Sequence, residues 1–204
     1  VTASDGTNST TQDITITITD TDDTAPVFTS SASFSAAENQ TSIGTVTATD
    51  VDTDNASITF SISGSELSIT AGGVLTFASA PDYETKSSYS ATVTASDGTN
   101  SSTQDITVTV TNVNDNSPVF TSGAAFSAAE NQTSVGTVVA NDADGDSLTY
   151  SLSGADASAF SVNSSTGVIT FKSAPDYETK TSYSVTVTAS DGTNADTQSL
   201  TISI

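Results

Sequence analysis

The sequence repeats itself with a period close to 93 residues, and this period restricts the fold more than any other feature. The heptapeptide TASDGTN occurs at residues 2–8, 94–100 and 188–194, so its successive copies lie 92 and 94 positions apart. Two further motifs each occur twice, SAAENQTS at residues 35–42 and 127–134, and APDYETK at residues 80–86 and 174–180. Such a period is too long for one turn of a solenoid and matches one β-sandwich domain.

Apolar residues alternate with Ser and Thr inside each period. The clearest runs are Tyr89-Ala91-Val93-Ala95, Ile106-Val108-Val110, Tyr183-Val185-Val187-Ala189 and Leu200-Ile202-Ile204. Alternation of this kind predicts strands that bury one face, and the Asp-Gly and Gly-Gly pairs between the runs predict turns. We therefore expect an all-β chain of tandem seven-stranded Greek-key sandwiches of the immunoglobulin-like type, arranged end to end.

The period also predicts the limits of the repeats. Residues 1–23 are expected to hold the last two strands of a preceding repeat, residues 24–116 a complete repeat, and residues 117–204 another. Strands without sheet partners leave open edges. The leading segment is therefore expected to pair with strands outside this sequence, in a longer array or in a neighbouring subunit of a filament, or else to be disordered in isolation.

The charge of the chain is strongly one-sided. It has 24 Asp and Glu against 3 Lys and Arg, a formal net charge of −21 at pH 7. This balance excludes nucleic acid as a partner and favours cations, because clustered carboxylates repel one another unless counter-ions neutralise them. The absence of Cys excludes disulfides and thiolate metal sites. No apolar run approaches the roughly 20 residues that a membrane span needs, so no membrane insertion is expected in this window.

Acidic motifs recur at fixed places and in a fixed order. In the first full repeat and the junction that follows, they are AAEN (36–39), DVD (50–52), DYE (82–84), ASDG (95–98) and NVNDNSPVF (112–120). Together these motifs resemble the calcium-binding motifs of the cadherin repeat, AxEN, DxD, DxE, AxDxG and DxNDNxPxF. Each motif alone arises by chance in an acidic sequence, and the resemblance depends on their order and repetition over the whole chain.

The resemblance implies calcium sites to which loops of consecutive repeats contribute, since Ca²⁺ takes six to eight oxygen ligands. For the one complete junction, it implies the ligands Glu38, Asp82, Glu84, Asn114, Asp115, Asn116, Asp142, Asp144 and Asp191. For the upstream junction it implies Asp20, Asp22, Asp23, Asp50, Asp52 and Asp97, and for a downstream junction Glu130, Asp176 and Glu178. Asn112 stands where the family usually has Asp, and the shortened loop 142–146 leaves the role of Asp146 open.

Two other classes of function receive less support from the residues. The chain has no His, Cys or Arg and no GxSxG pattern, so an enzyme is not expected. A calcium-dependent carbohydrate-binding module would use Tyr faces to stack on sugar rings. However, the chain has no Trp, and Tyr89, Tyr150 and Tyr183 fall in the strand alternation that predicts a core.

The expected function is therefore mechanical. We expect a calcium-rigidified, extracellular or cell-surface repeat array that serves cell adhesion or forms a stiff stalk, of the kind found in large, often microbial, adhesins. Its expected partners are neighbouring repeats of the same chain, with a homophilic or fibre partner and surface glycans as further possibilities. A filament subunit with partner-completed sheets and the carbohydrate-binding module stay open as alternatives.

Overall fold

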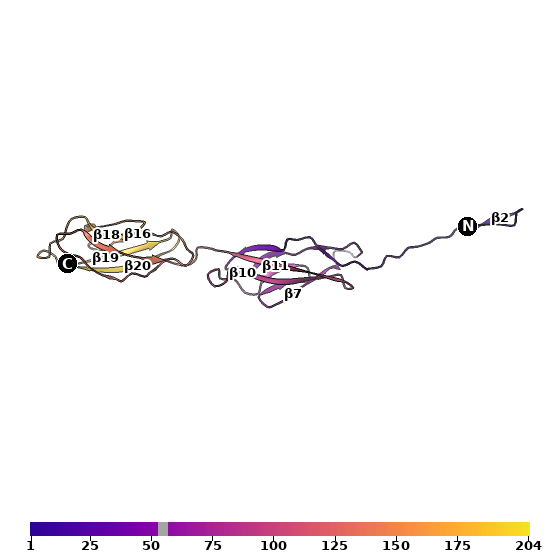
Figure 1. Ribbon diagram of the computed structural model, residues 1–204, viewed down its shortest axis with the longest axis horizontal. Helices are drawn as coiled ribbons and strands as arrows, with labels where there is room; N and C mark the ends of the chain where they lie inside the picture. Colours follow the sequence, from indigo (N-terminus) through magenta and orange to yellow (C-terminus); the bar gives the residue numbers. More distant parts are fainter. Residues whose placement is uncertain (53–56) are drawn as a thin grey trace. The chain divides into compact units, whose positions relative to one another are not determined.

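The computed structural model describes residues 1–52 and 57–204, and almost all of its regular structure is strand (Figure 1). The chain forms two compact units, one of residues 1–81 and 88–110 and one of residues 82–87 and 111–204. The loop 82–87, which carries the DYE motif, therefore belongs to the second unit. Within the described residues, no helix has the length and apolar character that would let it span a bilayer.

The first unit contains one sandwich preceded by a short hairpin. The hairpin strands are β1 (Thr2–Ser4) and β2 (Ser9–Thr11). The sandwich strands are β3 (Val27–Phe28), β4 (Ser33–Ala37), β5 (Ser42–Thr45), β6 (Ala48–Thr49), β7 (Thr59–Ile62), β8 (Leu67–Ile69), β9 (Val74–Phe77), β10 (Ser88–Ser96) and β11 (Ser101–Thr111). One sheet has the order β4-β11-β10-β7, and the other layer consists of β5-β9-β8 and the pair β3-β6.

The second unit repeats this arrangement. Its strands are β12 (Val119–Phe120), β13 (Ala125–Ser127), β14 (Ser134–Thr137), β15 (Ala140–Asn141), β16 (Thr149–Ser153), β17 (Phe160–Val162), β18 (Val168–Phe171), β19 (Ser182–Ser190) and β20 (Ala195–Ser203), with one 3-10 turn, η2 (Ala157–Ala159). Its sheets have the orders β13-β20-β19-β16 and β14-β18-β17, with the pair β12-β15. The two sandwiches have the same strand order in their sheets, which confirms that the repeat in the sequence is also a repeat in the structure.

The last strand of the second sandwich lies between two partners. It runs antiparallel to β19, where Val185 faces Leu200 and Tyr183 faces Ile202, and parallel to β13, where Phe126 faces Ile202. Strands that are neighbours in space but far apart in sequence give the Greek-key topology that was predicted.

The alternating residues form the core as expected. In the second sandwich Val185, Val187, Leu200 and Ile202 are buried, whereas the Ser and Thr between them face outward or are half-buried. The ring of Tyr183 contacts Phe160 and Phe171 at centroid distances of 5.5 and 5.1 Å. The Tyr150 hydroxyl accepts a hydrogen bond from the Ala140 amide at 3.0 Å. These tyrosines are therefore packing residues, which removes two aromatic faces from any sugar-binding surface.

Gly167 occupies a position that no other residue fits. Its φ is +69°, and a Cβ atom at this position would lie 2.3 Å from the Val138 carbonyl oxygen. That carbonyl cannot move freely, because the Val138 amide donates to the Gly167 carbonyl at 3.0 Å. Gly73 has the same place in the first sandwich, with φ +85° and the Val46 carbonyl oxygen at 2.2 Å. Glycine is required here for its conformation and for the close backbone approach.

We expect Gly167→Ala to destabilise the second sandwich by roughly 2 to 4 kcal/mol, through left-handed strain together with steric overlap. Chemical denaturation followed by circular dichroism measures the change. The control is Gly64→Ala, because Gly64 has φ +81° but no atom within 4 Å of the added Cβ. The Gly64→Ala variant has the left-handed strain without the steric overlap, so its free energy of unfolding should fall by roughly 1 kcal/mol. Equal losses in the two variants would contradict the role given to the Val138 carbonyl.

Candidate metal centre

The aspartate of each TASDGTN motif uses only one of its carboxylate oxygens to build its turn. Asp191 Oδ1 accepts hydrogen bonds from the amides of Thr193 and Asn194, both at 2.6 Å. Asp97 Oδ1 accepts the equivalent pair at 2.7 and 2.6 Å. The second oxygen, Oδ2, is buried in both residues and has no hydrogen-bond partner. A buried carboxylate oxygen without a partner is costly, unless a cation satisfies it.

The loop between β15 and β16 brings three carboxylates together. One oxygen each of Asp142, Asp144 and Asp146 lies within 4.8 Å of the others. Asp142 Oδ1 accepts from the Asp146 amide at 3.3 Å, while Asp142 Oδ2 is buried and has no hydrogen-bond partner. Gly145, with φ +83°, makes the tight turn that returns Asp146 toward Asp142. The shortened loop therefore places Asp146, whose role the sequence left open, in a carboxylate group with Asp142 and Asp144.

Asp144 also fixes the linker that precedes the second sandwich. Its Oδ2 accepts from the amides of Asp115 and Asn116 at 3.0 and 2.8 Å, and its Oδ1 accepts from Asn116 Nδ2 at 3.0 Å. The Asn112 side chain donates to the Asp144 carbonyl oxygen at 2.8 Å. Asn112 therefore has a structural partner at the place where the cadherin motif has Asp.

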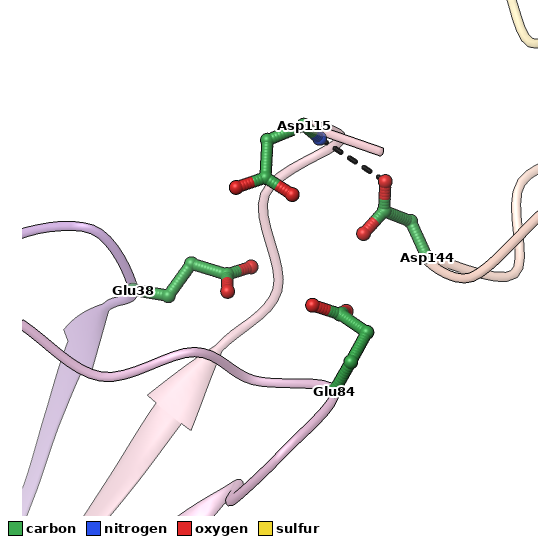
Figure 2. A group of neighbouring side chains, drawn as sticks. All are labelled: Glu38, Glu84, Asp115 and Asp144. Atoms are coloured by element: carbon green, nitrogen blue, oxygen red, sulfur yellow. Dashed lines mark hydrogen bonds between the residues drawn. The ribbon is translucent and has the colours of Figure 1, made fainter. Parts of the chain in front are cut away.

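Figure 2 shows the largest carboxylate group, in which the side chains of Glu38, Glu84, Asp115 and Asp144 point toward one another. Each residue offers one oxygen within 4.8 Å of the other three. Glu38 is only 3% exposed, whereas Glu84 and Asp115 are exposed and Asp144 is half-buried. Four carboxylates at this separation repel one another strongly without a cation, because like charges a few ångströms apart are destabilising.

The first sandwich carries a similar group. Oxygens of Asp22, Asp50 and Asp52 lie within 4.8 Å of one another. Asp52 Oδ2 accepts from the amides of Asp23 and Thr24 at 3.3 and 2.9 Å, as Asp144 does in the second sandwich. The Asp52 amide in turn donates to Asp50 Oδ1 at 2.8 Å.

A further group is formed by the exposed residues Glu130, Asp176 and Glu178. The Tyr177 amide donates to Glu130 Oε2 at 3.3 Å, which draws the two loops together. Asn131 helps in the same way, because it adopts a left-handed conformation with φ +62° and its amide donates to the Pro175 carbonyl at 3.0 Å. Asn39 and Pro81 make the equivalent contact at 3.0 Å.

Several predicted ligands lie outside these carboxylate groups. Asp82 directs both carboxylate oxygens to Thr85, accepting from its amide at 3.1 Å and from its hydroxyl at 3.0 Å. Asp97 and Asp191 present the buried Oδ2 atoms described above. Asp20 and Asp23 are not in a group within the described residues, although the Asp23 amide binds Asp52.

Two asparagines that the sequence did not single out hold the linkers. Asn194 Nδ2 donates to Asn114 Oδ1 at 2.9 Å and to the Asn116 carbonyl at 3.2 Å. Asn100 Nδ2 donates to the carbonyls of Asp22 and Thr24, both at 3.3 Å. Both are the final residue of TASDGTN, and their fixed position three residues after the aspartate was the signal that could have identified them.

Hydrogen bonds lower the pKa of three candidate ligands, Asp52, Asp144 and Asp191. The Asn116 side chain, with the Asn116 and Asp115 amides, holds the pKa of Asp144 below its usual value despite partial burial. Thr24 does the same for the pKa of Asp52. Burial raises the pKa of Asp191, but the amides of Asn194 and Thr193 outweigh it and the net shift is downward. Anionic oxygens are therefore present for a cation at neutral pH.

The donor set fits Ca²⁺. Every candidate ligand is a carboxylate, an amide or a carbonyl oxygen, and the chain has no Cys or His. Hard oxygen ligands of this kind are typical of Ca²⁺ and Mg²⁺ rather than of zinc or copper. The buried oxygens of Asp97, Asp142 and Asp191 that lack hydrogen-bond partners are the atoms that such an ion would satisfy.

Comparison with known proteins gives a consistent result. A family model described as "Cadherin domain" matches residues 30–111 and 124–204. Mouse protocadherin Fat 4 is 39% identical over 142 residues, which covers 63% of this chain and 3% of that protein. Mouse cadherin EGF LAG seven-pass G-type receptor 1 is 32% identical over 211 residues, covering 94% of this chain and 7% of that protein. The chain thus spans a small part of the curated relatives that it matches.

Solved structures of similar fold come from the same group of proteins. The EC3-6 cis-dimer structure of protocadherin gammaB7 superposes with a TM-score of 0.80 at 27% identity, covering 96% of this chain and 56% of that one. Mouse cadherin-23 EC22-24 superposes with a TM-score of 0.76 at 29% identity, covering 91% of this chain and 66% of that one. These matches confirm the predicted class of sandwich.

Proposed function

Because this chain belongs to the cadherin family, we propose that its acidic loops bind Ca²⁺ and that the bound ions stiffen a tandem array of extracellular repeats. The relatives that the chain matches are named as cadherins and protocadherins, and we propose that this chain is likewise an extracellular adhesion module rather than an enzyme. Calcium binding and the mechanical role are the parts that require a test.

The observation that carries the proposal is the set of buried carboxylate oxygens without hydrogen-bond partners, on Asp97, Asp142 and Asp191. Neighbouring carboxylates repel each other and leave these atoms unsatisfied, so the loops are arranged for a ligand that the protein atoms do not provide. A solvated acidic surface would instead direct such oxygens into water.

The proposed ligands of the second repeat are the carboxylates of the loop 142–146, Asp191, and Glu84 with Asp115 and Glu38. Asn114 and Asn116 hold the linker through Asn194 and Asp144, and they contribute oxygens where the geometry allows. We propose the equivalent roles for Asp20, Asp22, Asp23, Asp50, Asp52 and Asp97, and for Glu130, Asp176, Glu178 and Asp82. A bound ion supplies positive charge and crosslinks loops that otherwise repel one another.

We also propose that the repeat boundaries lie at residues 24–116 and 117–204, with residues 1–23 ending a preceding repeat. Within this scheme, neighbouring repeats of the same chain are the first partners. A homophilic contact between copies is the proposed adhesive interaction, in line with the cis-dimer structure of protocadherin gammaB7.

Small-angle X-ray scattering with Ca²⁺ and with a chelator tests the stiffening directly. With Ca²⁺, we expect scattering profiles that one conformation fits, whereas chelation should require a broad ensemble of conformations. Mg²⁺ at the same concentration is the control for simple charge screening, because it dehydrates reluctantly and demands a tighter octahedral site. Superimposable profiles with and without the chelator would refute the mechanical role.

A further inference from the structure

The linker that precedes the second sandwich, residues 112–116, is held by hydrogen bonds in which no metal ion takes part. Asn194 Nδ2 donates to Asn114 Oδ1 at 2.9 Å and to the Asn116 carbonyl oxygen at 3.2 Å. A main-chain carbonyl can only accept, so the nitrogen of the Asn194 amide group must face the linker. Two oxygens that could bind a cation are therefore satisfied by a neutral donor of the chain itself.

Asp144 holds the same linker from the loop between β15 and β16. Its Oδ2 accepts from the amides of Asp115 and Asn116 at 3.0 and 2.8 Å, and Figure 2 shows the first of these bonds. Its carbonyl oxygen accepts from the Asn112 side chain at 2.8 Å. The cadherin motif has Asp at this place, as the first linker has at Asp20, and a carboxylate cannot donate. Asn112 therefore adds a contact that the family pattern does not provide.

The first sandwich repeats this arrangement one period earlier. Asn100 Nδ2 donates to the carbonyl oxygens of Asp22 and Thr24, both at 3.3 Å, and Asp52 Oδ2 accepts from the Thr24 amide at 2.9 Å. Asn100 and Asn194 are both the last residue of TASDGTN. The same pairing of an amide donor with a carboxylate acceptor at two linkers indicates a common function.

We propose that Asn112, Asp144 and Asn194 form a linker clasp, which keeps residues 112–116 docked on the second sandwich when no Ca²⁺ is bound. The contacts involve both ends of the linker and two loops of the sandwich, one after β15 and one before β20. Hydrogen bonds to a charged group such as Asp144 are stronger than those between neutral groups. Bonds that act in parallel also share the entropy cost of ordering one short segment. The linker therefore stays ordered without an ion.

The clasp makes Asn194 a positioning residue for calcium, and in this respect the inference rests on the proposed function. Asn114 Oδ1 and the Asn116 carbonyl oxygen each keep a second lone pair, so the bonds from Asn194 do not prevent them from binding an ion. An ion that meets an ordered linker loses less of its binding free energy to ordering the chain. Chelation should thus remove the ion while the linker keeps its contacts with the sandwich that follows it.

Amide hydrogen exchange of the full chain in a chelator, resolved by NMR, tests the clasp. In the wild type, the amides of Asp115 and Asn116 should exchange at least about 10-fold more slowly than in an unfolded chain. In Asn194→Ala their exchange should be roughly 10-fold faster than in the wild type, because two hydrogen bonds to the linker are lost. Exchange at unfolded-chain rates in the wild type would overturn the proposal.

Asn194→Asp separates hydrogen bonding from packing. The side chain keeps its size and shape, but at neutral pH it has no donor and its oxygen faces the Asn114 and Asn116 oxygens. The exchange of the Asp115 and Asn116 amides should therefore rise at least as much as in Asn194→Ala. Wild-type exchange in Asn194→Asp would mean that Asn194 only fills space, which also overturns the proposal.

Asn100→Ala is the matched control, since it makes the same change in the first sandwich. It should accelerate the exchange of the Thr24 amide and leave the Asn116 amide unchanged, while Asn194→Ala does the reverse. Equal acceleration at both linkers in either variant would reflect overall stability and would contradict the clasp.

The amides of β19 and β20 show whether the second sandwich stays folded in Asn194→Ala. If they lose protection, Asn112→Ala replaces that variant, because Asn112 is exposed and its side chain donates to the Asp144 carbonyl. A roughly 3-fold faster exchange at Asp115 is then expected, and an unchanged rate overturns the proposal.

Isothermal titration calorimetry with Ca²⁺ tests the positioning role. Asn194→Ala should weaken calcium binding by about 10-fold although no carboxylate is lost, as is typical for partners that orient metal ligands. Unchanged affinity together with faster linker exchange would overturn the positioning role. A wild type that binds no Ca²⁺ would refute the proposed function, whereas the exchange rates in the chelator still decide on the clasp.

Discussion

Removing Ca²⁺ with a chelator should lower the melting temperature of the chain by about 10 to 20 °C. An ion that binds only the folded state at 100 times its Kd contributes about 2.7 kcal/mol, and about 1 kcal/mol shifts the melting temperature of a domain of this size by about 4 to 8 °C. The reason is local, because carboxylates that face one another at Glu84, Asp115 and Asp144 lose the charge that holds them together. Differential scanning calorimetry over a series of Ca²⁺ concentrations measures the shift.

Ionic strength is the control for this experiment. The chain has a net charge of −21, so NaCl also stabilises it by screening repulsion over about 10 Å at 0.1 M. Screening is not specific to a site and saturates smoothly, whereas binding raises the melting temperature with the logarithm of free Ca²⁺ above Kd. A chain whose melting temperature responds equally to NaCl and to CaCl₂ at matched ionic strength has no calcium site.

The sandwich could be predicted from the sequence because the relevant signal is short-range. The alternation at Tyr183-Val185-Val187 and at Leu200-Ile202 predicts which side of each strand is buried, and that side is buried in the structure. The breaks that divide β3 from β4 and β5 from β6 were not predictable in the same way. They depend on the changes of sheet partner along each segment, which the residues do not encode locally.

The site was predictable in its residue types and less so in its geometry. Glu38, Glu84, Asp115 and Asp144, which the resemblance implied as ligands, each offer one oxygen within 4.8 Å of the others, and their binding of an ion stays a prediction. The two identical APDYETK loops, however, use their aspartates differently. Both aspartates accept from the hydroxyl of the threonine three residues later through Oδ2, but Asp82 Oδ1 accepts from the Thr85 amide, whereas Asp176 Oδ1 accepts from the Glu178 amide and Asp176 lies in a carboxylate group. The identical motif therefore gives the same contact to the threonine hydroxyl, but it does not determine whether the aspartate joins a carboxylate group.

The roles of Asp146 and Asn194 could not be assigned from the sequence for a related reason. Asp146 falls in a shortened loop, so no family position could be assigned to it before Gly145 was seen to return it toward Asp142. Asn194 ends a motif in which the aspartate, Asp191, is the residue that resembles a calcium ligand. Its contacts with Asn114 and Asn116 join residues that are 80 and 78 positions apart in the sequence. A local sequence pattern cannot predict contacts over such separations.

Replacing Glu84 by alanine should weaken binding of one Ca²⁺ on the order of 100-fold, since loss of an outer-shell partner alone costs 10- to 100-fold and loss of a ligand is not expected to cost less. Glu84 is exposed and belongs to the loop 82–87, so its truncation removes no core packing. Its oxygen lies within 4.8 Å of those of Asp115 and Asp144, and a bound ion would lose one of its anionic ligands. Isothermal titration calorimetry measures the affinity and the number of sites.

Asp13→Ala is the matched control, because it also removes one carboxylate from an exposed residue and Asp13 belongs to no carboxylate group within residues 1–52 and 57–204. Its calcium affinity should equal that of the wild type, and both variants should keep the wild-type circular dichroism spectrum, since the sandwich cores are unchanged. If Glu84→Ala and Asp13→Ala weaken binding equally, the ions respond to overall charge. If neither variant weakens it, Glu84 is not a ligand, and the convergence seen in Figure 2 has another cause.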